Sequence, residues 1–273
     1  MREYESLLSW VKNRRMLMVS DSVDRFQTAF FCDLLDQAPV IGQGRHSTYW
    51  CHISYLNFTV MHWHIASFVT NRPPWGWWTK FFQPTFDKVV GMNGRSFDLI
   101  MLQSGLWDQQ MYAFAYMTDN GEQELDFSRP LNWPELRFYM QRERSLITVL
   151  RQQFGNDVPI VYRITWHSNL HDINRAAQFV AHEIDMEIMD FGNMVHGHEH
   201  LYFDGAHLGR GTLSIWANMW LWYLFRGQGG IEVKGRIVQM PSEDKPYNLS
   251  QNWNFCHEKF MNDHRKWESQ MAN

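Results

Sequence analysis

The feature that most constrains the fold is a regular alternation of short apolar segments with helical patterns. Extended segments are predicted at Met16–Val19, Trp50–Val60, Ser96–Leu102, Val158–Ile164 and Glu187–Phe191. Helical periodicity starts at Val23 after the first strand and recurs over Pro134–Phe154, Ile173–Met186 and Leu208–Phe225. This order predicts an α/β fold: a three-layer α/β/α sandwich of the flavodoxin-like kind, with a mostly parallel sheet of roughly five strands.

The chain has 273 residues and shows no internal repeat or clean linker, so we expect one domain over residues 1–273. Two insertions interrupt the alternation, at 62–85 and at 112–133, and a C-terminal extension without clear periodicity covers 227–273. Long insertions in a compact α/β domain are usually functional loops at the carboxyl ends of strands.

Composition excludes some partners. The formal net charge is -4, which gives no reason to expect nucleic acid. No run of eighteen apolar residues is present, so the sequence predicts no membrane span. Aromatic residues make up 16% of the chain, which suits either an aromatic core or a surface that stacks on sugar rings. The oligomeric state does not follow from the sequence.

Two features bear on the cellular compartment. Cys32 and Cys51 are close in sequence and suited to pair, with Cys256 left over; three reduced, buried cysteines are the alternative. Asn57 and Asn248 each begin an acceptor sequon for N-glycosylation. We therefore expect the secretory pathway or the extracellular space, with the targeting segment absent from this chain, and the cytoplasm as the alternative.

Ser22 stands where the first strand turns into a helix, in the sequence SDS. A serine hydroxyl needs a base to become a nucleophile, and helix N–H groups at the first turn can bind a developing oxyanion. The simpler interpretation is structural, because Ser and Asp before a helix are common N-caps.

Asp204 and His207 lie in the sequence DGAH, at a spacing that lets a tight turn bring the carboxylate onto one ring nitrogen. The other nitrogen is then free to act as a general base. The alternative is an aspartate that caps a helix starting near Leu208.

Taken in order, three blocks make the sequence resemble the SGNH/GDSL hydrolase superfamily. Ser20-Asp21-Ser22 stands for the Gly-Asp-Ser block, Gly105-Leu106-Trp107-Asp108 for the Gly-x-Asn-Asp block, and Asp204 to His207 for the Asp-x-x-His block. The sequences SDSVDR and GLWD are most similar to the PC-esterase branch, which includes trichome-birefringence-like polysaccharide O-acetyltransferases and fungal proteins linked to capsule and cell-wall acetylation.

The resemblance implies that Ser22 is the nucleophile, His207 the base and Asp204 its orienting partner. It implies oxyanion donors at the Ser22 backbone and at Gly44, with Gly42 as the less favoured alternative to Gly44. Trp107 replaces the asparagine that supplies a third donor in most relatives, so its indole N–H or the Gly105 backbone would have to substitute. Asp108, Arg45 and Arg163 complete the expected oxyanion and substrate-binding residues, although Arg163 also suits an ordinary buried ion pair. No cofactor is implied.

Two histidine-rich stretches, His62-Trp-His64 and His196-Gly-His198-Glu199-His200, resemble metal ligands in spacing only; no matching scaffold accompanies them, so no metal is expected. His167 ends the RITWH sequence after the fourth strand and is a further residue that would face the cleft. Trp75, Trp77 and Trp78 form either a sugar-stacking wall or an apolar lid.

The sequence thus predicts a serine esterase or deacetylase that acts on acyl esters, O-acetyl in particular, of a carbohydrate. A polysaccharide O-acetyltransferase with the same triad is one alternative, since the sequence does not show whether water or a sugar hydroxyl accepts the acyl group. A non-catalytic carbohydrate-binding relative is the other, because Trp107 and Ser20 depart from the family pattern.

Overall fold

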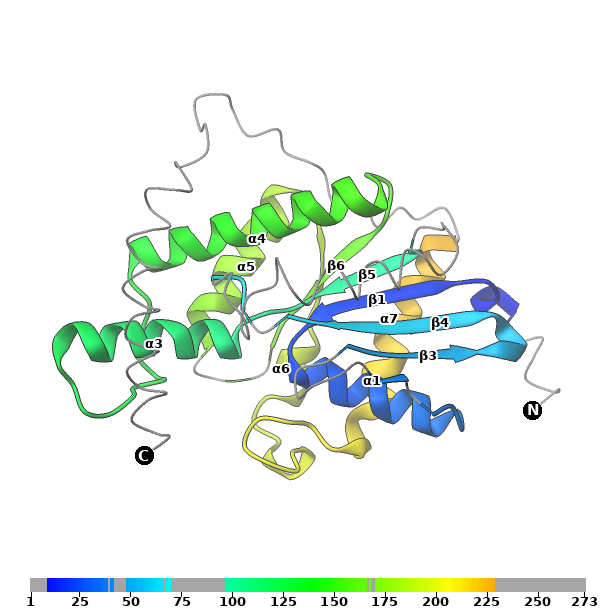
Figure 1. The fold of residues 1–273 in the computed structure, drawn as a ribbon, viewed down its shortest axis with the longest axis horizontal. Coiled ribbons are helices and arrows are strands. Elements are labelled where there is room, and N and C mark those ends of the chain that lie inside the picture. Colours follow the sequence, from blue (N-terminus) through cyan, green and yellow to red (C-terminus); the bar gives the residue numbers. More distant parts are fainter. Residues whose placement is uncertain are drawn as a thin grey trace.

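The computed structural model describes residues 9–38, 40–41, 48–65, 67–69, 97–165, 167 and 170–228 (Figure 1). A seven-stranded sheet lies at the centre, in the order β2-β3-β4-β1-β5-β6-β7. Its strands are β1 (Arg15–Ser20), β2 (Val40–Ile41), β3 (Tyr49–Ile53), β4 (Phe58–His64), β5 (Leu99–Leu102), β6 (Ile160–Arg163) and β7 (Glu187–Met189).

The predicted mostly parallel sheet is confirmed. β4, β1, β5, β6 and β7 run parallel to one another, and the edge strands β3 and β2 add antiparallel pairs. The expected single extended segment over Trp50–Val60 is instead a hairpin. The chain reverses through a 3-10 turn at Ser54–Leu56 and at Asn57, whose φ of 48° lies in the left-handed region that asparagine tolerates.

The helices flank the sheet on both sides (Figure 1). They are α1 (Ser22–Leu34), α3 (Leu106–Asn120), α4 (Trp133–Phe154), α5 (His171–Glu183), α6 (Phe191–Val195) and α7 (Leu213–Gln228). α4 is nearly the predicted helix. Asn132 and Glu135 form a reciprocal capping box at its start, and Gly155 ends it at a φ of 98°.

Two apolar cores lie on the two faces of the sheet. Side chains of β1 alternate between them: Leu17 and Val19 pack with α3, α4 and α5, whereas Met16 and Met18 pack with α1, α6 and α7. The strands that form these cores are buried on both faces, as parallel strands in such a sandwich must be. The three-layer α/β/α architecture follows from this alternation.

Several predicted boundaries differ from the structure. Much of the expected insertion at 112–133 is helix, because α3 continues to Asn120 and Gly121 ends it. The last helix begins at Leu213 rather than Leu208, after a 3-10 turn at Arg210–Thr212. The insertion at 62–85 begins inside β4, and its residues 70–85 lie outside the described part of the chain, as do residues 229–273. No helix among the described residues is long and apolar enough to cross a membrane.

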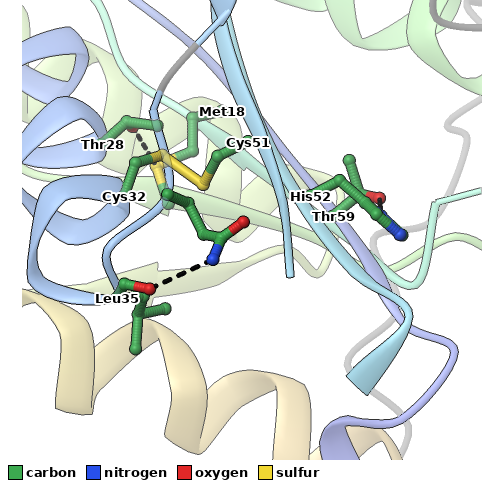
Figure 2. Close-up of a disulfide and its surroundings, with 8 residues drawn as sticks. Met18, Thr28, Cys32, Leu35, Cys51, His52 and Thr59 are labelled. Atoms are coloured by element: carbon green, nitrogen blue, oxygen red, sulfur yellow. Dashed lines mark hydrogen bonds between the residues drawn. A yellow bond between two sulfur atoms is a disulfide. The ribbon is translucent and has the colours of Figure 1, made fainter. Parts of the chain in front are cut away.

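A disulfide joins Cys32, near the end of α1, to Cys51 in β3 (Figure 2). The two Cα atoms are 5.9 Å apart, a normal separation for a disulfide, and both side chains are buried. The bond therefore ties α1 to the antiparallel edge of the sheet, and the alternative of three reduced cysteines is wrong.

Strand order also predicts where a ligand would bind. The chain leaves β1 through α1 on one face of the sheet and leaves β5 through α3 on the other. Adjacent strands with connections on opposite faces form a topological switch point, and the crevice at their carboxyl ends is the usual ligand site of such sheets. Ser22 begins α1 and Gly105 immediately precedes α3, so both lie at this point.

Candidate active site

The turn between β1 and α1 sets the position of Ser22. Asp21 is the N-cap of α1, and its Oδ1 accepts a hydrogen bond of 2.9 Å from the Val23 N–H. Ser22 is therefore the first residue of the helix and not its cap. The expected N-cap is therefore present in Asp21, and the Ser22 hydroxyl is not engaged in capping.

The hydroxyl instead meets a histidine from the far end of the chain. Ser22 Oγ lies 2.8 Å from His207 Nε2, across 185 residues of sequence. On the other side of the ring, His207 Nδ1 lies 2.8 Å from Asp204 Oδ2 and 3.0 Å from Oδ1. The three side chains form one continuous chain of hydrogen bonds at the carboxyl end of β1.

The loop that carries Asp204 and His207 is held by its own backbone. Tyr202 and Leu208 form an antiparallel bridge, and the Phe203 N–H donates to the His207 carbonyl at 3.0 Å. Asp204 Oδ1 accepts the backbone N–H groups of Ala206 and His207, at 2.8 and 2.7 Å. Asp204 caps this turn and not a helix, since α7 begins only at Leu213.

The tautomer of His207 follows from its partners. A carboxylate only accepts, so Nδ1 carries the ring proton toward Asp204, and the lone pair of Nε2 faces the serine hydroxyl. Partial burial opposes ionisation of Asp204, but hydrogen bonds from Ala206 and His207 outweigh it and hold the pKa of the carboxyl below its ordinary value. Asp204 is thus a carboxylate at neutral pH.

Two aromatic rings enclose His207. Phe203 stacks on it with centroids 5.6 Å apart and planes 16° apart, and Phe26 meets it edge-on at 4.7 Å. Phe26 lies one helical turn after Ser22, on the same face of α1. Phe203 remains 54% exposed, so the base is walled by aromatic surface that is open to solvent on one side. Sequence reasoning did not identify either phenylalanine.

A buried ion pair lies beneath the nucleophile. Arg163, at the end of β6, donates to Asp24 in the first turn of α1, with a closest approach of 2.9 Å, and both side chains are nearly inaccessible. The indole Nε1 of Trp216 in α7 donates to Asp24 Oδ1 at 3.1 Å. This corrects the expectation that Arg163 contacts substrate. Its buried ion pair with Asp24 instead holds α1 against the sheet.

His62 supports the same turn from β4. Its Nε2 lies 2.9 Å from the Asp21 carbonyl oxygen and 3.1 Å from Ser20 Oγ. Burial is the main cause that lowers the pKa of His62, to about 3, so the ring is neutral in ordinary buffers. Asp21 itself also accepts from Gln103 at 3.3 Å, and burial raises the pKa of its carboxyl.

The GLWD block forms the start of α3. Gly105 has a φ of 152°, and a Cβ there would lie 3.2 Å from Thr165 Cγ2, so glycine suits the position. Trp107 is half-buried on the first turn of α3. Asp108 is fully buried: its Oδ1 accepts from the Ser67 hydroxyl at 2.6 Å.

Asp108 anchors the chain after β4 rather than facing a ligand. The backbone N–H groups of Phe68 and Val69 donate to Oδ1 at 2.8 and 3.1 Å, and the Ser104 hydroxyl donates to Oδ2. Burial raises the pKa of this carboxyl to about 7. The expectation that Asp108 binds substrate directly is therefore corrected to a positioning role.

His167 lies beside the Asp204 and His207 loop, as its place after β6 suggested. A hydrogen bond joins its ring to the backbone of Ala206, and burial is the main cause that lowers its pKa. Gly44 and Arg45, and the tryptophans Trp75, Trp77 and Trp78, lie outside the described residues.

The histidine-rich stretches do not form a metal centre in the described part of the chain. His196, His198 and His200 are exposed on the loop after α6, whereas His62 and His64 are buried in β4. No group of three or more potential ligands converges among the described residues.

The fold and the site together define an α/β/α protein with a Ser–His–Asp hydrogen-bond chain at the carboxyl ends of its parallel strands. No family model matches the sequence, and a search of the curated proteins finds no match.

Among solved structures, the chain is similar to Axe2, an acetylxylan esterase from Geobacillus stearothermophilus, at 11% identity and a TM-score of 0.43; the match covers 79% of this chain and 96% of that one. A catalytic mutant of the same enzyme matches at 10% identity and a TM-score of 0.44, over 78% of this chain and 94% of that one. At these values the likeness assigns neither activity nor substrate to this chain.

Proposed function

We propose that this chain is a serine esterase that removes acyl groups, O-acetyl in particular, from a carbohydrate. The observation that carries the proposal is the hydrogen-bond chain from Ser22 through His207 to Asp204. The blocks SDS, GLWD and DGAH support a place in the SGNH/GDSL superfamily, nearest in motif to the PC-esterase branch.

The first half of the reaction forms an acyl-enzyme. Ser22 Oγ attacks the ester carbonyl carbon while its proton passes to His207 Nε2, and the Asp204 carboxylate stabilises the resulting imidazolium. The carbonyl oxygen becomes an oxyanion, and the Ser22 backbone N–H at the first turn of α1 binds it. His207 then returns the proton to the alcohol oxygen, and the sugar hydroxyl leaves.

The second half regenerates the serine. Water gives a proton to His207 and attacks the acyl carbon, and the carboxylic acid leaves Ser22 as the hydroxyl recovers its proton. If a sugar hydroxyl attacks in place of water, the same residues perform O-acetyl transfer. Product analysis separates the two outcomes: free acetate indicates hydrolysis, whereas acetylated acceptor indicates transfer.

The aromatic wall beside the base supports a carbohydrate as the alcohol part of the ester. Phe203 stacks on the ring of His207, the base that must protonate the leaving alcohol, and is itself 54% exposed. Apolar C–H faces of sugar rings pack well on such surfaces. Phe203→Ala should raise KM for acetylated oligosaccharides while leaving KM for an aryl acetate unchanged, and an equal rise for both would remove this support.

The disulfide supports the expected compartment. Disulfides persist where conditions are oxidising, in secreted proteins and in secretory compartments, and are rare in the reducing cytosol. The buried Cys32–Cys51 bond therefore favours the secretory pathway or the extracellular space.

The decisive test of the triad is Ser22→Ala, assayed on an aryl acetate and on acetylated xylo-oligosaccharides. We expect a loss of about 10⁴-fold or more in kcat. A fluorophosphonate should label Ser22 of the wild type and leave the variant unlabelled. Ser214, exposed on α7, provides the matched control, since Ser214→Ala should change neither result. A Ser22→Ala variant with full activity refutes the proposal, and binding of glycan without turnover or labelling in the wild type indicates a non-catalytic relative.

A further inference from the structure

We propose that His62 is a positioning residue that orients the peptide unit between Asp21 and Ser22, and with it the oxyanion-binding N–H of the nucleophile. The inference rests on the proposed function, because it assigns a role to a residue behind the same serine. It concerns a side chain that lies on a neighbouring strand, forty residues away from Ser22 in the sequence.

The position of His62 follows from strand register. β1 and β4 run parallel, with Met18 opposite His62 and Ser20 opposite His64. His62 is fully buried, and its Nε2 reaches past the end of β1 to the Asp21 carbonyl oxygen at 2.9 Å. A carbonyl oxygen only accepts, so Nε2 carries the proton and His62 is the donor. Ser20 Oγ, at 3.1 Å, is a second acceptor for the same N–H.

The contacted carbonyl shares a peptide bond with the N–H of Ser22. Because a peptide unit is planar and trans, fixing the direction of its C=O also fixes the direction of its N–H. A donor on the C=O also polarises the N–H at the opposite end, which strengthens it as a donor. The contact therefore acts on the group that would bind the oxyanion, without approaching the substrate.

The donor is stable because of its surroundings. Burial keeps the His62 ring uncharged, with a pKa lowered to about 3, so its single N–H stays on Nε2 over the working range of an esterase. The neighbouring histidine does not suggest a metal, because the His62 and His64 rings stand 5.8 Å apart and no three-ligand group exists among the described residues.

The experiment compares His62→Met, which removes the donor at similar volume, with His62→Gln, whose amide N–H can reach the same carbonyl. The matched control is His52→Met on the adjacent strand β3, where the ring nitrogen Nδ1 of His52 lies 3.0 Å from Thr59 Oγ1 in β4. The assay measures kcat and KM on an aryl acetate, with inhibition by phenylboronic acid as a probe of the oxyanion site. Boron bonds to Ser22 Oγ, and one of its oxygens occupies the oxyanion position.

We expect His62→Met to lower kcat about tenfold with KM unchanged, less than the 10²–10³-fold that follows loss of a donor outright. Boronate affinity should fall by the same factor, His62→Gln should recover most of both, and His52→Met should match the wild type. Fluorophosphonate labelling of wild-type Ser22 checks the proposed function separately. If His62→Met does not fold, His62→Asn, whose shorter amide does not reach Asp21, replaces it. Wild-type kcat and boronate affinity in the donor-less variant, or equal losses in the Gln variant, would overturn the inference.

Discussion

The two halves of the candidate triad are held in different ways. Ser22 stands on a buried turn fastened by distant residues: Asp24 is paired with Arg163 across 139 positions, and His62 reaches the turn from β4. Asp204 and His207 lie on an exposed loop, and the hydrogen bonds that the Asp204 carboxylate accepts there span three residues or fewer. Asp204 is 46% exposed in its side chain, whereas Asp24 is 3% exposed.

We expect this difference to separate residues whose substitution lowers stability from residues whose substitution affects only the reaction. Side chains around Ser22 fill the interior between the sheet and α7, so changes there should disturb folding together with activity. The base loop contributes little buried surface, so changes there should remove activity and leave the free energy of unfolding nearly unchanged. The four predictions below test that division.

Asp204→Asn should have the largest effect. The amide can present its N–H₂ to Nδ1, which favours the wrong His207 tautomer and directs the Nε2 proton at the serine. We expect kcat to fall by about 10⁴-fold, as loss of the orienting carboxylate does in comparable triads. Urea denaturation should give the wild-type midpoint, because the side chain is exposed. A large drop in the midpoint would show that the loop also supports the fold.

Arg163→Met tests the buried half of the candidate triad, which carries Ser22. It leaves the Asp24 carboxylate buried, with the Trp216 indole N–H as its remaining side-chain donor among the described residues, and removing one member of a buried pair costs about 3–5 kcal/mol. We expect that loss in the free energy of unfolding, with lower activity as α1 shifts. Arg210→Met is the control: it breaks the exposed pair with Asp33 and should change stability little. Equal effects of the two substitutions would contradict the division.

The same contrast explains what the sequence could predict. The DGAH turn is local, so residue types and spacing indicated that Asp204 could pair with His207, although they left a helix-capping aspartate as an equal alternative. The strand at the start of the chain and the helix ended by Gly155 also follow from local periodicity and capping. That Ser22 meets His207 was inferred from resemblance in the ordered blocks, and no local signal carries it.

A buried ion pair was one of the alternatives for Arg163, but the partners that Arg163 and His62 contact escaped prediction for a physical reason. The approach of His62 to Asp21 depends on the register of two parallel strands, and the Asp24 and Arg163 pair depends on which face of the sheet α1 covers. Neither the register of the two strands nor the face of the sheet that α1 covers can be inferred from the spacing of residues in the sequence. The hairpin of β3 and β4 was missed because it reverses at Asn57 without glycine or proline.

Loss of the disulfide should have an intermediate effect. Cys32 and Cys51 are separated by 19 positions, and closing a loop of that length constrains the unfolded chain by about 3 kcal/mol. Cys32→Ala should lower the free energy of unfolding by about that amount in urea denaturation. Activity under native conditions should persist, since Ser22 begins α1 and Cys32 lies near the opposite end of that helix. The difference from wild type should vanish when both proteins are unfolded in strong reductant, and its persistence there would assign the loss to packing.

The smallest expected effect is a pH dependence of the free energy of unfolding that comes from His62 in the buried half of the site. The pKa of His62 is about 3 in the folded chain, below its usual value of 6.5, with desolvation as the main cause and Asp24 and Arg25 as the charged neighbours. Above pH 6.5 neither state binds the proton, and the contribution of His62 to stability is complete. As pH falls below 6.5, His62 binds a proton in the unfolded chain but not in the folded chain. The free energy of unfolding therefore falls by about 1.4 kcal/mol per pH unit.

Asp21 and Asp108 act in the opposite direction, because burial raises the pKa of each, and a folded carboxyl that holds its proton gains stability as pH falls. The measurement is therefore a difference: the free energy of unfolding of wild type minus that of His62→Gln, from pH 8 to pH 5. We expect this difference to shrink by about 2 kcal/mol below pH 6.5. A flat difference for His62→Gln would mean that the ring takes up a proton in the folded protein, and the buried half of the site would then be less rigid than its contacts indicate.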